Sequence, residues 1–216
     1  MNEPITLREA ATQLRTRMWR TAGARFNCYR RMKRRNTLSA FTIATLSVYL
    51  IGITVCQKVY DIGHTNPIFD NHLSSVSIIG AIFIVVLSLI EWAEDYSSRG
   101  DKLFENATEI KIFQSKIERA LINGTSEDKL KQEFEQVNTG YESLTNKNSF
   151  NHDPIDDFLF RAQNPTESNI SFQMNCCTRL WARIWWFFVA YWIYITALIT
   201  PVLAIVFLYC KTASLS

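Results

Sequence analysis

The chain has 216 residues, of which 48% are hydrophobic and 20% are charged, and its formal net charge at pH 7 is +3. These averages would suit a soluble domain, but the charged residues are segregated from three long uncharged runs, which excludes an ordinary soluble globular protein. The five cysteines are an odd number without paired spacing, so no disulfide framework is expected.

The first 37 residues form a basic arm with ten lysines and arginines and two acidic residues. Thr6 and Glu9 have the spacing of a capping box, which marks the start of a helix. Apolar side chains then recur at steps of three or four residues, at Leu7, Ala11, Leu14, Met18, Ala22, Phe26 and Tyr29. The pattern predicts a basic amphipathic N-terminal helix within residues 1–37, with an arginine-rich opposite face.

Three uncharged runs are long enough to cross a bilayer. The run at 36–57 has 22 residues and as a helix would span about 33 Å, close to the thickness of the hydrocarbon core. It begins too far into the chain to be a signal peptide. Similar runs follow at 71–90 and 184–210. The sequence therefore predicts an all-α integral membrane protein. The expected transmembrane helices are 38–60, 73–92 and 185–210.

The distribution of positive charge predicts the topology. The short connection at 61–72 contains no lysine or arginine, in contrast to the basic arm. The positive-inside rule therefore places the N-terminus in the cytoplasm and this loop outside. Because the second helix returns the chain, residues 91–183 are expected in the cytoplasm of a multi-pass inner-membrane protein.

Residues 93–144 are predicted to form a cytoplasmic helical hairpin that continues the second transmembrane helix. The Asn123-Gly124 pair is typical of a helix end. Two coiled-coil-like seams flank it, Tyr96, Leu103, Ala107, Ile110, Ile117 and Leu121 before the turn, and Leu130, Phe134, Val137, Tyr141 and Leu144 after it. Residues 91–144 hold twelve acidic and seven basic residues. The basic arm could therefore pack on the hairpin, or its arginines could lie on anionic lipid headgroups.

The segment 145–169 is rich in Asn and Asp and contains two prolines, which favours a polar linker interrupted by the short apolar piece Ile155 to Phe160. Asp156 and Asp157 are interpreted as solvated loop residues within it. From residue 170 the pattern becomes amphipathic, with Phe172 and Trp181 beside arginines. This favours an interfacial helix at 170–184 before the third transmembrane helix.

Motifs for catalysis or cofactor binding are missing from the sequence. There is no phosphate-binding glycine loop, no His-Glu-x-x-His and no Cys-x-x-Cys, and the three histidines are split across the predicted membrane. No cofactor, metal, catalytic residue or small-molecule substrate is therefore expected, and the protein is predicted not to be an enzyme.

Small and polar residues inside the first two transmembrane helices form a candidate stripe: Thr42, Thr45, Tyr49, Gly52, Cys56, Ser77, Gly80 and Ser88. Such residues permit close helix packing in lipid, or they could line a water-filled path through an oligomer. Glu91, Glu94 and Asp95 follow the second helix. In a ring of subunits they would form an acidic cytoplasmic mouth that attracts cations, or they are single surface acids.

The arrangement resembles the SLATT domains, two-transmembrane effectors of bacterial conflict systems. The residues that carry the resemblance are Tyr96 to Leu121 and the NHDPIDDFLF run at 151–160, and the resemblance covers residues 5–165. It implies an oligomeric, pore-forming anti-phage effector that depolarises the inner membrane and causes abortive infection. Within that family, the chain looks more like the subfamily that is typically encoded with reverse transcriptases. The third transmembrane helix departs from the two-helix pattern.

The leading hypothesis is therefore a homo-oligomeric membrane pore that assembles in the lipid bilayer. Its trigger would be a separate sensor, such as a reverse transcriptase or a nucleotide-signalling system, because the chain carries no fused sensor domain. The alternative is a non-catalytic membrane-anchored adaptor whose hairpin docks a partner protein.

Overall fold

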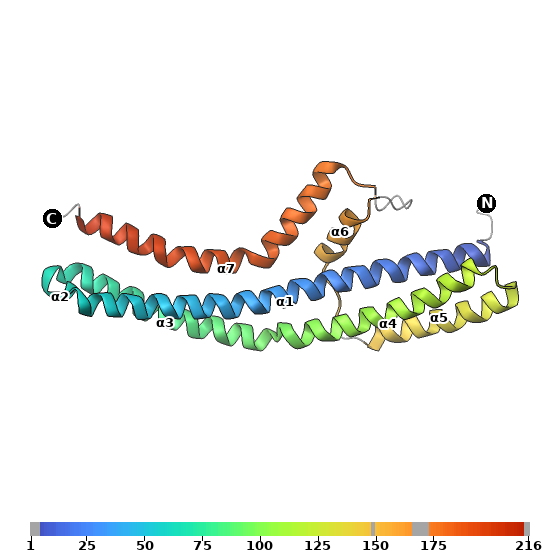
Figure 1. The fold of residues 1–216 in the computed structure, drawn as a ribbon, viewed down its shortest axis with the longest axis horizontal. Coiled ribbons are helices and arrows are strands. Elements are labelled where there is room, and N and C mark those ends of the chain that lie inside the picture. Colours follow the sequence, from blue (N-terminus) through green and yellow to red (C-terminus); the bar gives the residue numbers. More distant parts are fainter. Residues whose placement is uncertain (1–4, 148–149, 166–172, 214–216) are drawn as a thin grey trace. The chain divides into compact units, whose positions relative to one another are not determined.

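A computed structural model describes residues 5–147, 150–165 and 173–213. Every regular element in these ranges is a helix, and three of the helices are long and apolar enough to cross a membrane (Figure 1). The predicted all-α membrane fold is confirmed. The chain divides into two compact units, which are described separately. The arm–hairpin unit comprises Met1–Lys33 and Ser97–Phe188, and the membrane unit comprises Arg34–Tyr96 and Val189–Ser216.

Helix α1 runs without interruption from Leu7 to Val59, through the basic arm and the first predicted transmembrane helix. Its start has the predicted capping box: the backbone N–H of Glu9 donates to Thr6 Oγ1 at 3.3 Å, and the N–H of Thr6 donates to Glu9 Oε2 at 2.9 Å. No proline occurs within it to end the helix. The apolar face predicted for the arm is buried at Ala11, Leu14, Met18 and Ala22.

Helices α4 (Tyr96–Ile122) and α5 (Glu127–Lys147) form an antiparallel pair beside the arm (Figure 1). The turn between them contains Gly124 with a φ of 59°, a left-handed conformation that glycine adopts without steric cost. The core between α1, α4 and α5 contains the second predicted seam and all of the first except Tyr96 and Leu103. Its buried members from the hairpin are Ala107, Ile110, Ile117, Ala120, Leu130, Val137 and Tyr141.

Helix α6 (Pro154–Gln163) lies inside the segment 145–169 that was predicted to be a polar linker. That prediction was wrong for these ten residues, because Asp153 and Pro154 occupy the N-cap and first helical positions, and Leu159, Phe160 and Ala162 are buried. Residues 148–149 and 166–169 of the segment lie outside the described residues. Helix α1 approaches α6 closely at Gly23, where an added Cβ would lie 1.9 Å from a ring carbon of Phe160.

In the membrane unit, α1 is followed by α2 (Ile62–Thr65) and α3 (Pro67–Glu94). The predicted outer loop at 61–72 therefore contains a short helix and the first turns of α3. Asn66 and Pro67 explain the early start: Asn66 Oδ1 accepts a hydrogen bond from the N–H of Phe69 at 3.1 Å, and proline suits the first helical position. Gln57 Nε2 donates to Asp70 Oδ1 at 2.8 Å, which ties the two helices together at this end.

The boundaries after the second transmembrane helix also differ from those expected. Helix α3 ends at Glu94, Asp95 has a left-handed conformation with a φ of 42°, and α4 begins at Tyr96. The expected uninterrupted continuation into the hairpin was therefore wrong at Asp95.

Helix α7 extends from Cys176 to Ala213 without a break, so the interfacial helix expected at 170–184 and the transmembrane helix expected at 185–210 are one element. Residues 170–172 lie outside the described residues.

Candidate functional site

The predicted small and polar stripe of α1 changes its surroundings along the helix. Thr42 is fully buried, and Thr45 is half-buried with its hydroxyl donating to the carbonyl oxygen of Phe41 at 2.9 Å. Tyr49, Gly52 and Cys56 are exposed. Within one copy of the chain the stripe is therefore packed at its beginning and uncovered further along.

The stripe of α3 is more like a helix-packing surface than the stripe of α1 is. An added Cβ at Gly80 would lie 2.9 Å from Leu50 Cδ2 of α1, so the absence of a side chain allows these helices to approach. Ser77 is half-buried. Ser88 is also half-buried, and its hydroxyl donates to the carbonyl oxygen of Ile84 at 2.7 Å.

The three acids of the expected mouth have different environments. Glu91 is half-buried and accepts a hydrogen bond from the hydroxyl of Tyr194 at 2.8 Å, which links α3 to α7. Glu94 is half-buried, and the exposed Asp95 occupies the left-handed position between α3 and α4. Glu91 therefore has a structural contact in addition to any role at a mouth.

The best-defined cluster of polar groups lies in the arm–hairpin unit, around the two aspartates interpreted as solvated. Asp156 has no exposed surface. Its carboxylate accepts from Arg31 Nε at 3.1 Å and Nη2 at 2.8 Å, and from Trp186 Nε1 at 3.0 Å. Arg31 Nη2 also pairs with Asp153. The interpretation of Asp156 as a loop residue in solvent was therefore wrong, because α1, α6 and the beginning of α7 enclose it.

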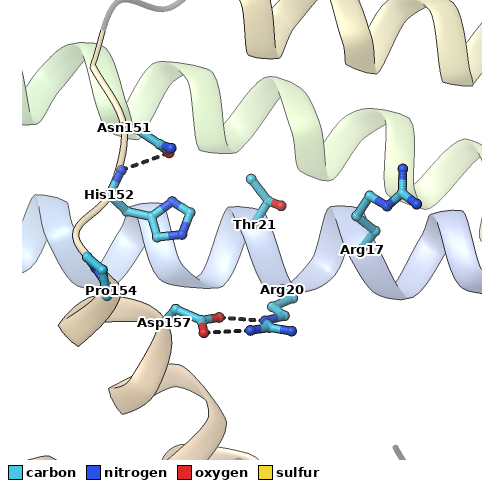
Figure 2. Close-up of a pocket in the computed structure, with 7 residues that line it drawn as sticks. All are labelled: Arg17, Arg20, Thr21, Asn151, His152, Pro154 and Asp157. Carbon is cyan, nitrogen blue, oxygen red and sulfur yellow. Dashed lines mark hydrogen bonds and ion pairs between the residues drawn. The ribbon is translucent and has the colours of Figure 1, made fainter. Parts of the chain in front are cut away.

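Asp157 was also misinterpreted, since its side chain is only 13% exposed. It forms a two-pronged ion pair with Arg20, in which Nε and Nη2 of the guanidinium each lie 2.6 Å from a carboxylate oxygen (Figure 2). Arg161 Nε lies 3.2 Å from the same carboxylate. Parallel hydrogen bonds of this kind are stronger than those of a single-contact pair.

Electrostatics keeps the groups of these pairs charged. Burial opposes the charge of Arg31, but the hydrogen bonds and charge of Asp156 outweigh it and raise the pKa of Arg31. Burial would likewise raise the pKa of Asp157, but the hydrogen bonds and charge of Arg20 lower it below the usual value. The neighbouring Cys28 thiol has its pKa raised to about 12, chiefly by burial.

These groups join α1, α6 and the beginning of α7 through ion pairs and hydrogen bonds. The Cys28 thiol is protonated near neutral pH and is therefore a poor nucleophile. Among the described residues, no group of three or more His, Cys, Asp or Glu side chains is placed to hold a metal ion. The sequence did carry a local signal for α6, since Asp153, Pro154 and Asp156 occupy the N-cap, N1 and N3 positions of a helix start.

The basic arm also contacts the hairpin directly. Arg15 Nη1 lies 3.3 Å from Glu118 Oε1, and Lys33 Nζ lies 3.0 Å from Asp101 Oδ2. The arm therefore packs on the hairpin, as one of the two expected alternatives proposed. The most buried carboxylates that the arm contacts, those of Asp156 and Asp157, belong to α6 and not to the hairpin.

The three apolar helices and the charged helical unit define an integral membrane protein with a substantial polar domain. Residues 7–207 match the SMODS and SLOG-associating 2TM effector domain family 5. The chain belongs to this family of membrane effector domains from anti-phage and conflict systems. The match includes most of α7, so the third apolar helix is part of the matched region and not an addition to it. No curated protein and no solved structure matches the chain.

Proposed function

We propose that the protein is a homo-oligomeric, pore-forming effector that depolarises the bacterial inner membrane and causes growth arrest or cell death. Family membership supports a membrane effector of a conflict system. The pore, the inner-membrane location and the cytoplasmic N-terminus are parts of the proposal. The basic arm and the absence of lysine and arginine from residues 61–72 support this orientation.

The environment of Tyr49 is the observation that carries the proposal. Tyr49 lies near the middle of the uncharged run 36–57, and its side chain is 38% exposed. Its hydroxyl has no hydrogen-bond partner among the described residues. A hydroxyl without a partner in the hydrocarbon core is costly, so another subunit or water in a lumen is needed to satisfy it.

Gly52 and Cys56 extend the exposed face beyond Tyr49. An added Cβ at Gly52 would meet no atom within 4 Å, so packing inside one copy does not explain the glycine. In a closed ring of identical subunits, each such position repeats around the axis. One flank of the stripe can then pack on a neighbouring helix while the other faces water.

A separate sensor is the proposed trigger. A reverse transcriptase or a nucleotide-signalling system would act on the arm–hairpin unit, which contains most of the charged groups of the chain. The description of the family as SMODS and SLOG-associating supports a separate signalling partner. The partner would be identified by co-purification from cells that contain the neighbouring genes.

The proposal is tested by recording membrane potential with a voltage-sensitive dye in bacteria that express the chain from an inducible promoter. We expect rapid depolarisation and growth arrest with the unchanged chain and loss of both with Gly52→Leu, because a large side chain would obstruct the exposed stripe. Ile51→Leu is the matched control: Ile51 is 64% exposed on the same turn, and its replacement conserves apolar character. Depolarisation by Gly52→Leu, inserted at normal levels, would contradict the role of the stripe.

A membrane-anchored adaptor is the second candidate, favoured by exposed apolar residues on the hairpin. Ile112 and Ile122 of α4 are 54% and 76% exposed. In an adaptor, Ile112→Ser would abolish partner capture, and Gly52→Leu would leave it unchanged. In a pore, Gly52→Leu would abolish depolarisation by the chain acting alone, and Ile112→Ser would leave that depolarisation unchanged.

A further inference from the structure

An open pocket of about 420 Å³ lies in the arm–hairpin unit, between α1 and the segment that leads into α6 (Figure 2). Its volume is in the range of small-molecule sites. The polar residues that line it are Arg17, Arg20, Thr21, Asn151, His152 and Asp157. Neither the stripe of α1 and α3 nor the acids at the end of α3 contribute a residue to this pocket.

The charge around the pocket is positive. The carboxylate of Asp157 is already engaged by Arg20 and Arg161, so it is not free to neutralise another cation fully. Arg17 is exposed at the rim and forms no ion pair with any described residue. The region holds five guanidinium groups and three carboxylates, which leaves a surplus of positive charge. The guanidinium groups are those of Arg17, Arg20, Arg25, Arg31 and Arg161, and the carboxylates are those of Asp153, Asp156 and Asp157.

A buried arginine next to the pocket contributes to this surplus. Arg25 lies one helical turn after Thr21 on the same face of α1 and is only 3% exposed. Its Nε and Nη1 atoms are buried without a hydrogen-bond partner in the part of the chain that the structure describes. Buried charged groups are ordinarily paired, so these two nitrogens of Arg25 are suited to donate to an anion.

His152 connects Arg25 to the pocket. Its Nδ1 atom is also buried and unpartnered within the described chain. Burial, followed by the charge of Arg25, lowers the pKa of His152, so these two groups are close enough to interact. The hydroxyl of Thr21, 3.0 Å from that of Tyr141, adds a further donor or acceptor at the wall.

We propose that this pocket binds a phosphate-bearing ligand, with Arg17, Thr21 and His152 at the phosphate oxygens and the charge of Arg25 favouring the bound anion. A guanidinium, a hydroxyl and an imidazole that line one pocket from two segments suit the several oxygens of a phosphate. A divalent cation would be repelled by the same charges. Because His152 is the only aromatic ring among the described lining residues, the phosphate and not a stacked base is the recognised group.

The phosphate could belong to a soluble phosphate ester or to a lipid headgroup. Residues 26–35 separate Arg25 from the uncharged run along the chain. Both sources present the same oxygens to the pocket, so the experiment has one arm for each. Phosphate binding is measured directly on the purified chain, so its outcome is independent of pore formation.

In the first arm, the full chain in a non-ionic detergent is titrated with sodium phosphate, and sodium chloride is lowered to keep the ionic strength constant. The unfolding midpoint is recorded for the unchanged chain, for Arg17→Gln and for Arg8→Gln. Arg17 is chosen because it is exposed and its replacement leaves the core intact, whereas loss of Arg25 could prevent folding. Arg8 is exposed on the same helix, far from the pocket, and is the matched control for loss of one positive charge.

We expect a saturable rise of the midpoint in the unchanged chain and in Arg8→Gln, with an affinity roughly tenfold weaker in Arg17→Gln. In the second arm, the chains are placed in phosphatidylcholine nanodiscs with or without phosphatidic acid. An Arg17-dependent rise in this arm alone would identify a lipid headgroup as the source. If the three chains respond alike in both arms, the pocket is not a phosphate site.

Discussion

Trp186 Nε1 donates a hydrogen bond of 3.0 Å to Oδ1 of Asp156, the same oxygen that accepts from Arg31 Nε. One buried carboxylate thus joins α1, α6 and the beginning of α7. Trp186 is itself buried, with 6% of its surface exposed. Because donors from two helices converge on this one side chain, the position of α6 depends on the charge of Asp156.

Replacing Asp156 by Asn should lower the free energy of unfolding by about 3–5 kcal/mol, because it leaves the buried charge of Arg31 without its main partner. Thermal or chemical unfolding of the detergent-solubilised chain measures this. Asp101→Asn is the control, since Asp101 pairs with Lys33 at a side chain that is 60% exposed, and exposed pairs contribute less than about 1 kcal/mol. Equal losses of the free energy of unfolding in the two variants would show that the buried pair stabilises the fold no more than the exposed pair does.

Gly23→Ala should destabilise the arm–hairpin unit by about 1–3 kcal/mol, because the new methyl group would overlap the ring of Phe160. Helix propensity alone would give the opposite sign, since alanine is favoured over glycine by about 1 kcal/mol within a helix. The sign of the change therefore distinguishes the close approach from propensity. Phe160→Leu in the same chain should recover part of the loss, and a stabilised Gly23→Ala variant would contradict the observed contact.

The long apolar helices and the amphipathic arm could be predicted because their signals are local. Uncharged runs and apolar residues at steps of three or four need no knowledge of the rest of the chain. The pairing of Arg31 with Asp156 could not be predicted in this way, because 125 residues separate them. Composition was misleading at Asp156, since an Asn- and Asp-rich segment also suits a solvated linker. The helix-start pattern at Asp153 and Pro154 and the apolar piece Ile155 to Phe160 were local signals against that interpretation.

The break at Asp95 was also beyond local prediction. No proline or glycine marks it, and the left-handed conformation is uncommon for an aspartate. The burial of the candidate pore residues could not be predicted from local sequence either. Periodicity places Thr42 and Tyr49 on one stripe, but only the packing of neighbouring helices shows that Thr42 is buried while Tyr49 is exposed.

Acid should destabilise the arm–hairpin unit through His152. Its pKa is lowered by burial and by the charge of Arg25, while Asp157, Asp156 and Asp153 act in the opposite direction. As the pH falls through about 6.5, the unfolded chain takes up a proton that the folded chain does not, so the free energy of unfolding decreases. Above that value the contribution of His152 is constant.

The measurement is the unfolding midpoint between about pH 7.5 and about pH 5.5 for the unchanged chain and for His152→Gln. We expect the variant to show a shallower loss of stability over this window, because glutamine does not titrate. Asn151→Gln, a neighbouring exposed residue, is the control for local packing. Identical slopes in all three chains would mean that His152 has the same proton affinity in the folded and unfolded states.

Cys56 allows a direct test of the oligomer. It is an exposed free cysteine, one residue from the end of the uncharged run, and it continues the face of Tyr49 and Gly52. If this face lies at the axis of a homo-oligomer, Cys56 side chains of adjacent copies approach each other, and a disulfide forms when their Cα atoms come within about 7 Å. Mild oxidation of membranes should then produce a covalent dimer that disappears in Cys56→Ser.

Cys210→Ser should leave the dimer unchanged, since Cys210 is an exposed free cysteine of α7 outside the stripe. A dimer that persists in Cys56→Ser and is lost in Cys210→Ser would place α7, and not α1, at the contact between copies.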